Sequence, residues 1–523
     1  MLKRAWKPVA AATGVVGAST YLWYSSSRSI NSETIGFRIR VRGADGKPTY
    51  QNMSAPLLSR DEVEKRIKDN AVLETVASGG SIRWKRATVS LASNDPIEDA
   101  NVHGVIPKDL LVRGAAGDFL FFAVMDGHAG PYTSRLLTKT LIPAVSLKLS
   151  EASMDGSKDG KSAADFLKRL KSLLWSSLPS PPSNGDANSA AVALEEAFVN
   201  LDSELINAPL RVLAANIDQT AREKKILPDL SQDPMAMAAI RPALSGSCAI
   251  AALIDTSQKM LYVACTGDSR AVVGVYEEHD DGTGSWRVEA LSEDQTGRNP
   301  KEYTRVRSEH PDDDPEDVIR AGRVLGGLEP TRAFGDARYK WPREIQQVLK
   351  QAYFPSSNEM RNPPSLLKTP PYVTARPVVT QTSLSLPSAS EQAKQKSTFR
   401  FLILATDGLW DRISSEDAVA LVGGFLSGLR GAVPKASLQS LIPTTIGTAT
   451  INGKDSEPQQ HSGEWAFVDD HVGTHLLRNA LAGASEKDLR ELVSIPAPYS
   501  RRYRDDITVT VVYWEEQTAA AKL

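Results

Sequence analysis

Five short segments of the chain each place an acidic side chain beside an apolar, strand-like run. They are Glu98–Asp99 in NDPIEDA, Asp126 in FFAVMDGHAG, Asp268 in YVACTGDSRA, Asp407 in FLILATDGLWD and Asp505–Asp506 in YRDDITVTVV. Buried strands normally end in apolar or turn residues, and carboxylates gathered at strand ends repel one another unless cations balance their charge. Because all-oxygen ligands suit hard cations, the pattern favours Mg²⁺ or Mn²⁺ over zinc.

Two such ions a few ångströms apart would hold a phosphoryl oxygen and make hydroxide available near neutral pH. Each block taken singly has a plainer interpretation, because Asp-Gly after a strand is more often a turn than a metal ligand. Repetition of one layout, an apolar strand followed or headed by Asp, favours a metallohydrolase. The spacing alone does not identify the substrate or the reaction more closely.

The acidic blocks need a strand-rich framework to bring them together. Strands are predicted in the apolar, β-branched or aromatic runs at Phe119–Met125, Met260–Val275, Thr398–Thr406 and Asp506–Trp514. Helices are predicted between them, at Ser134–Leu149, Ala190–Ile206, Ser415–Leu429 and Val472–Ala482. Because no βαβ repeat is visible, we expect an α+β fold in which helices cover antiparallel sheets.

Domain boundaries follow shifts in composition. We expect an N-terminal targeting segment at 1–32, a polar approach segment at 33–80 with one short helix near Asp61–Lys68, a catalytic domain at 81–515 and a tail at 516–523. Polar or proline-rich runs predict surface insertions, partly without fixed structure, near 151–188, 346–396 and 431–462.

Composition excludes some classes of function. A net charge of -2 argues against a nucleic-acid partner, which would require a basic surface. The two cysteines, Cys248 and Cys265, lie in apolar runs without zinc-ligand spacing. We expect them to be unpaired core residues of a reducing compartment.

The first 32 residues contain no Asp or Glu, but do contain Lys3, Arg4, Lys7, Arg28 and several serines. A basic, acid-free start predicts a mitochondrial presequence, drawn to anionic membranes and driven inward by the membrane potential. Two alternatives stay open: a secretory signal peptide, and a short anchor formed by the apolar run Val9–Tyr24. That run is shorter than the roughly 20 residues that a membrane span needs. We expect a matrix location, with the intermembrane space or association with the inner membrane as alternatives.

In their order along the chain, the acidic blocks resemble those of the metal-dependent protein phosphatases, the protein phosphatase 2C family. The segments that carry the resemblance are DGHAG at Asp126, GSCAIAALI at Gly246, YVACTGDSRAV at Tyr262, TRAFGD at Thr331, ATDGLWD at Ala405 and RDDITV at Arg504. The resemblance extends from about Trp84 to Trp514. It implies a central antiparallel β-sandwich flanked by helices, with the metal site at one end.

Carried across by motif, the resemblance assigns a role to each site residue. Asp126 would bridge two Mg²⁺ or Mn²⁺ ions, and the Gly127 carbonyl and Glu98 would ligate one of them. Asp407 and Asp505 would hold the other ion, and Asp268 and Asp411 a weaker third. His128 matches the general acid that protonates the leaving oxygen, a role that suits a histidine titrating near neutrality. The plainer interpretation of His128 is a hydrogen-bonding partner that supports the metal site.

The sequence departs from the family at one place. Many members carry a phosphate-binding arginine four residues before the glutamate matched by Glu98, and here that residue is Asn94. Asn94 is therefore the predicted contact to substrate phosphate, with an amide in place of a charge. This change, together with NDPIED, the runs at 291–311 and 323–341, and VGTHLLRNAL, resembles the mitochondrial pyruvate dehydrogenase phosphatase branch, where an asparagine also stands here.

The branch implies a phosphoserine substrate on the E1 α subunit of the pyruvate dehydrogenase complex, reactivated by dephosphorylation. Residues 291–330 would form a flap that meets this substrate, although a solvated mixed-charge helix explains each of its charges equally well. Direct hydrolysis by metal-activated water, without a phosphoenzyme, is expected. No cysteine lies in a phosphate-cradling loop, which excludes the phosphatases that use a cysteine nucleophile. The alternatives are a phosphatase of this branch with other substrates, a catalytically silent regulatory module, and an adaptor that works through its insertions.

Overall fold

Strand β6 (Asp118–His128) shows why the chain forms layers. Its residues alternate between two apolar surroundings: Phe121 is buried against helices, and its neighbour Phe122 is buried against strands of a second sheet. Because successive side chains of a strand point to opposite faces, both faces of this sheet must be covered. The computed structural model describes residues 33–42, 48–79, 82–111, 114–154, 189–218, 223, 226–386, 397–448 and 462–516.

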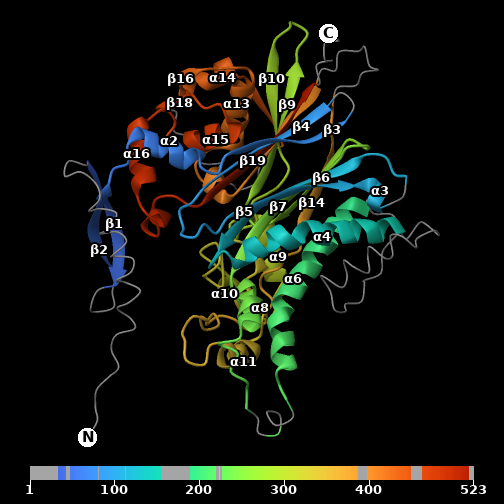
Figure 1. Cartoon of the computed structure of the whole chain (residues 1–523), viewed down its shortest axis with the longest axis vertical. Helices are drawn as coiled ribbons and strands as arrows, with labels where there is room; N and C mark the ends of the chain where they lie inside the picture. The colour runs from blue at the N-terminus through green and yellow to red at the C-terminus, as the bar shows by residue number, and fades with distance from the viewer. Residues whose placement is uncertain are drawn as a thin grey trace.

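Two sheets pack face to face at the centre of the molecule (Figure 1). The seven-stranded sheet has the order β17 (Thr444–Thr448), β10 (Gly284–Ala290), β9 (Arg270–Glu278), β15 (Ser397–Ala405), β19 (Ile507–Glu516), β4 (Ile82–Leu91) and β3 (Val72–Gly79). The other sheet has the order β14 (Val378–Ser383), β8 (Met260–Thr266), β7 (Gly246–Asp255), β6 and β5 (Ala100–Pro107), and the short β13 (Phe334–Gly335) also pairs with β7. Neighbouring strands within these sheets are antiparallel, apart from the parallel pair β10–β17.

Helices cover the outer face of each sheet. The seven-stranded sheet is covered by α2 (Arg60–Lys68), α12 (Asp407–Trp410), α13 (Ser415–Leu426), α15 (Val472–Leu481) and α16 (Glu486–Ser494). The other sheet is covered by α4 (Tyr132–Met154) and α6 (Ser189–Ala215), with α8 (Pro234–Leu244) and α11 (Arg343–Tyr353) packed beyond them. The expected α+β sandwich flanked by helices is confirmed.

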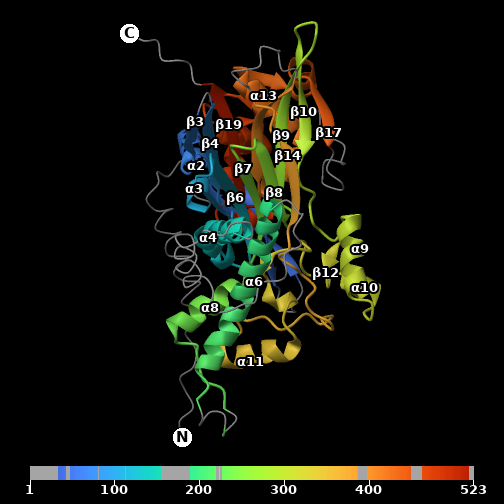
Figure 2. The ribbon, with the colours of Figure 1, turned by 90° about the vertical axis from the view of Figure 1, so that its right-hand side faces the viewer.

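Smaller elements surround this framework. The helices α3 (Lys108–Leu111) and α14 (Leu438–Leu441) and the pair β16 (Gly431–Pro434) and β18 (Glu464–Phe467) lie beside the sheets. A flap made of α9 (Pro300–Glu309), α10 (Pro315–Val318), β11 (Ile319–Arg320) and β12 (Arg323–Val324) projects to one side in Figure 2. A hairpin of β1 (Thr34–Arg42) and β2 (Pro48–Pro56) stands outside the sandwich, next to α16 in Figure 1.

Most of the predicted helices, and three of the four predicted strands, match elements of the structure to within a few residues. The predicted helix Ala190–Ile206 is too short, because α6 continues to Ala215. The run Met260–Val275 differs, because it forms the two strands β8 and β9. Gly267 turns the chain between them with a φ of 104°, in the left-handed region that favours glycine. The break places Asp268 in a turn at the end of a strand.

Two segments that their composition predicts to be peripheral contribute strands to the central sheets. The approach segment at 33–80 supplies β3, an edge strand of the seven-stranded sheet, so the sheet begins before residue 81. The interpretation of 346–396 as a surface insertion is wrong for residues 346–386. They include the end of α11 and all of β14, and they bury Tyr353 and Tyr372.

The segment at 431–462 likewise contributes β16, α14 and β17 over its described part. Most of the segment at 151–188 and all of residues 1–32, with the predicted presequence or anchor, lie outside the described residues. Cys248 and Cys265 are buried and unpaired, as expected. Within the described ranges, we find no helix with the length and apolar character that crossing a membrane requires.

Glu302 of α9 anchors the flap to the segment that leads into β13. Its carboxylate accepts from Arg332 Nη2 at 2.8 Å, from Arg305 Nη2 at 2.7 Å and from the Thr331 hydroxyl at 2.6 Å. Burial opposes ionisation of this group, but the two arginines outweigh burial and lower the pKa of Glu302 to about 2. An acid whose pKa is lowered by folding stabilises the fold above its unfolded pKa, and this contribution is lost as the pH falls.

We predict that Glu302→Gln lowers the free energy of unfolding at pH 7 by about 3 kcal/mol, because a buried arginine loses its charged partner. The difference between the variant and the parent protein should shrink as the pH falls from 4.5 towards 2. Urea unfolding at several pH values measures this. A difference that stays constant over that range would contradict the assigned pairing.

Candidate functional site

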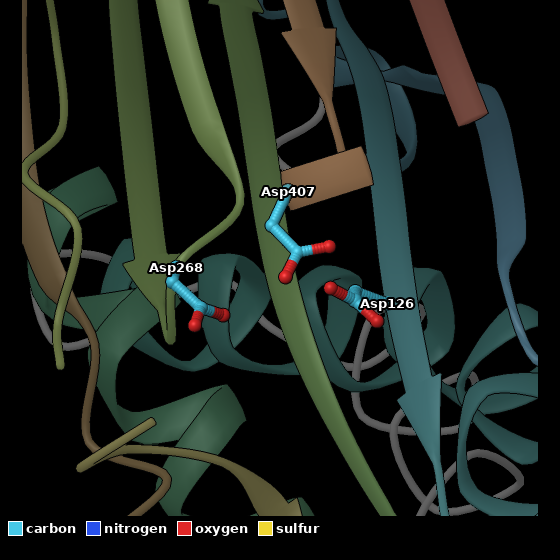
Figure 3. A group of neighbouring side chains, drawn as sticks. All are labelled: Asp126, Asp268 and Asp407. Atoms are coloured by element: carbon cyan, nitrogen blue, oxygen red, sulfur yellow. The ribbon is translucent and has the colours of Figure 1, made fainter. Parts of the chain in front are cut away.

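Three carboxylates from separate elements converge at one end of the sandwich. Asp126 lies near the end of β6, Asp268 in the turn between β8 and β9, and Asp407 at the first residue of α12, just after β15. Each offers an oxygen within 4.8 Å of the oxygens of the other two, and Figure 3 shows the three side chains pointing toward a common centre. These three predicted ligands are therefore brought together.

The three acids are poorly placed to ionise by themselves. Burial raises the pKa of Asp126 and of Asp407 well above the ordinary value. The charge of Asp407 raises the pKa of Asp126 further, and the charge of Asp268 raises that of Asp407. Burial, with other nearby carboxylates, raises the pKa of Asp268 to about 6. Like charges at this spacing are stable at neutral pH only beside positive charge, and oxygen donors suit Mg²⁺ or Mn²⁺. The donor set therefore fits hard divalent cations.

Glu98 and Gly127 meet at the edge of this cluster. Glu98 Oε1 accepts from the Gly130 amide at 2.7 Å, and the Glu98 carbonyl accepts from the Ser134 hydroxyl at 2.5 Å. A Cβ at position 127 would lie only 2.1 Å from the Glu98 carbonyl oxygen, so the approach of the two segments requires glycine. Burial raises the pKa of Glu98. The structure thus places both predicted ligands beside Asp126.

Asp505 and Asp411 lie close enough to the cluster for their charges to act on it. The charge of Asp505 helps to raise the pKa values of Asp126 and Asp407, and the charge of Asp411 helps to raise that of Asp407. The Asp411 amide also donates to the Asp407 carbonyl at 2.7 Å, within the turn of α12. Both residues therefore lie near the three-carboxylate cluster, but neither is one of the three acids whose oxygens converge.

Asp506 holds the loop that carries Glu98, a role that sequence reasoning missed. The buried Asp506 carboxylate accepts from the amides of Ser93, Asn94 and Glu98, at 2.5, 2.9 and 2.9 Å. Asn94 Nδ2 donates to the same carboxylate at 3.0 Å. The amide group predicted to contact phosphate is thus already hydrogen-bonded inside the protein. Asp505 and Asp506 are neighbours in the sequence, but the sequence does not show which of them would bind metal and which holds the loop.

Asp99 is a second buried acid at the site that was not assigned a role. Its Oδ2 accepts from the Thr406 hydroxyl at 3.0 Å, and its Oδ1 has no hydrogen-bond partner among the described residues. Burial raises the pKa of Asp99 well above the ordinary value, and its charge acts on Asp126 and Asp407. An unpartnered carboxylate oxygen in this position suits a site that holds cations and their water.

His128 is paired with Asp336, a residue that sequence reasoning also missed. The His128 Nε2 and Asp336 Oδ2 atoms lie 2.6 Å apart. Burial lowers the pKa of His128, but the Asp336 charge and hydrogen bond outweigh it, so the pKa is raised. A histidine that stays protonated near neutrality can donate a proton. The only sequence signal for Asp336 is its place in the family segment TRAFGD.

We predict that Asp407→Asn stabilises the metal-free protein and weakens its response to metal. Removing one charge relieves the repulsion in the cluster, so the Tm in chelator should rise by about 2 °C. The increase in Tm on adding Mn²⁺ should shrink. Differential scanning calorimetry measures both quantities.

Asp118→Asn is the matched control, because Asp118 lies at the opposite end of β6. This variant should keep the parent protein's response to Mn²⁺. A lower Tm for Asp407→Asn in chelator would contradict the repulsion described above.

Comparison with known proteins gives the context for this geometry. The sequence profile of the protein phosphatase 2C family matches residues 187–433. A protein phosphatase 2C homologue of Schizosaccharomyces pombe is 36% identical over 482 residues, covering 90% of this chain and 89% of that protein. The mitochondrial [pyruvate dehydrogenase [acetyl-transferring]]-phosphatase 1 of Saccharomyces cerevisiae is 31% identical, over 95% of this chain and 83% of its own length. The human protein of the same name is 30% identical, over 82% of this chain and 78% of its own length. The chain is a serine/threonine protein phosphatase and belongs to the protein phosphatase 2C family.

Proposed function

We propose that this chain acts in the mitochondrial matrix, where it removes phosphate from phosphoserine in the E1 α subunit of the pyruvate dehydrogenase complex and so reactivates it. The observation that carries the chemistry is the convergence of Asp126, Asp268 and Asp407 at one end of the sandwich. The substrate is supported by the similarity to pyruvate dehydrogenase phosphatases over most of the chain. The acid-free N-terminal sequence supports the mitochondrial location.

The metal site would use Asp126 together with the other predicted ligands near this end of the sandwich. Asp126, Glu98 and the Gly127 carbonyl would hold one Mg²⁺ or Mn²⁺ ion, and Asp126, Asp407 and Asp505 a second. Asp268 and Asp411 would hold a weaker third. When bound, the ions supply positive charge for the phosphoryl oxygens and lower the pKa of water.

The protein's own contribution to the reaction is a positioned proton donor. Asp336 orients His128 and raises its pKa. The protonated imidazole would give its proton to the serine or threonine oxygen as a water oxygen replaces that oxygen on phosphorus. A cysteine nucleophile is not available in this fold. Cys248 and Cys265 are buried, and burial raises the pKa of both thiols, so neither presents a thiolate.

The test is phosphate release from phosphorylated pyruvate dehydrogenase E1 α with Mg²⁺, Mn²⁺ or chelator, beside an unrelated phosphoserine peptide. We expect metal-dependent release that is faster from E1 α than from the peptide. Asp126→Asn should lower kcat at least a thousandfold, because it alters the residue predicted to bridge the ions. Asp118→Asn, at the other end of β6, should retain parental activity.

Each other outcome has a definite meaning. Release from the peptide alone would keep the phosphatase chemistry and remove E1 α as the substrate, leaving a phosphatase that acts on other phosphoproteins. Ordinary turnover by Asp126→Asn would contradict the metal assignment. No release with either metal would favour a catalytically silent module.

A further inference from the structure

An anionic phosphate must enter a site whose walls are carboxylates, and Arg501 is the side chain placed to receive it. Arg501 belongs to the short 3-10 helix η4 (Tyr499–Arg502), and its Nη1 pairs with the Asp505 carboxylate at the edge of the cluster. Its side chain is 50% exposed, so the guanidinium reaches solvent and the acidic site together. Its charge also lowers the pKa of Glu98, against the larger opposing effect of burial.

The other polar or cationic groups near this edge are already engaged. Asn94 Nδ2 donates to Asp506. Arg412 is half-buried and donates to the Tyr503 carbonyl at 2.5 Å. Arg504 is buried and donates to the Ala92 carbonyl at 2.5 Å. Among the described residues on this side of the cluster, Arg501 is the arginine that is both exposed and paired with a site carboxylate.

The N-terminal hairpin β1–β2 fixes η4 from outside the sandwich. The rings of Phe37 on β1 and Tyr499 on η4 lie 5.7 Å apart. The Tyr503 hydroxyl, just after η4, accepts from the Arg38 amide at 2.6 Å and donates to the Arg38 carbonyl at 3.0 Å. On its inner side, the Ser500 hydroxyl donates to the Ser93 carbonyl at 2.5 Å. The helix that carries Arg501 is therefore held between the hairpin and the Glu98 loop.

We propose that Arg501 binds the phosphate of the substrate, and that the β1–β2 hairpin is the element that positions it. A guanidinium offers paired N–H donors that match two phosphate oxygens, and it carries the charge that Asn94 lacks. The proposal rests on the proposed phosphatase function. It gives the hairpin, which contributes to neither sheet, a task in substrate binding.

The test compares Arg501→Ala and Arg501→Lys with Arg430→Ala. Arg430 is the control, because it is an exposed arginine that belongs to neither η4 nor the hairpin, and its guanidinium lies over the Phe425 ring at 6.0 Å. The probe is inorganic phosphate, titrated calorimetrically into protein saturated with Mn²⁺. KM and kcat for a phosphoserine peptide are measured in parallel.

Arg501→Ala should weaken phosphate binding and raise KM, each about tenfold, as expected for loss of a charge-assisted contact. Arg501→Lys should recover part of this loss, and Arg430→Ala should stay within about twofold of the parent protein. Phe37→Ala removes the ring contact to η4 and should weaken phosphate binding several-fold, with a smaller effect on kcat than on KM.

Unchanged phosphate affinity in Arg501→Ala would overturn the proposal. If this variant bound Mn²⁺ more tightly but phosphate equally well, Arg501 would serve only to balance the charge of Asp505. Parental affinity in Phe37→Ala would overturn the role of the hairpin. Failure of the proposed function is distinguishable, because it would appear as missing or unselective release of phosphate from E1 α by the parent protein, whereas phosphate binding and its dependence on Arg501 are measured without turnover.

Discussion

The mutual repulsion of carboxylates at one end of the sandwich is the constraint on which the rest of the structure depends. Asp126, Asp268 and Asp407 are brought within 4.8 Å of one another, and burial raises the pKa of each. A fold selected for stability alone would not gather these charges, because each costs free energy to bury without a partner. The arrangement becomes favourable when divalent cations occupy it, because their charge offsets the repulsion between the carboxylates. The ions that the reaction needs therefore also stabilise this end of the fold.

Polar side chains that lie outside the central cluster hold the loops around it. Asp506 fixes the loop before Glu98. Asp202 of α6 accepts from the Gly335 amide at 2.9 Å and from Lys340 Nζ at 2.7 Å, and so fixes the turn that presents Asp336 to His128. Gln295 does the same for the turn of Asp268, by accepting from the Gly267 amide at 2.7 Å. Rigid loops keep ligand and proton donor in place, which is the condition for catalysis by positioning.

Much of this arrangement was predictable from the sequence, because the information is local. Asp126 and Asp407 each follow an apolar strand, and alternation along β6 identifies a strand buried on both faces. Asp336 was not predicted as a site residue because its partner His128 is 208 positions away in the chain, and nothing in either neighbourhood shows the pairing. Asp506 was missed for the same reason, since its hydrogen bonds reach back to residues 93–98. Proline-rich composition misled the interpretation of 346–386, where Tyr353 and Tyr372 are buried against neighbouring elements.

The most direct test of the central claim is anomalous diffraction from crystals of this protein soaked in Mn²⁺. The electrostatic balance described above predicts two strong manganese peaks at the end of the sandwich, each about 2.1 Å from an Asp126 carboxylate oxygen. One peak should also contact Glu98, and the other Asp407. Absence of manganese between Asp126 and Asp407 at saturating concentration would contradict the claim that these carboxylates are gathered to hold cations.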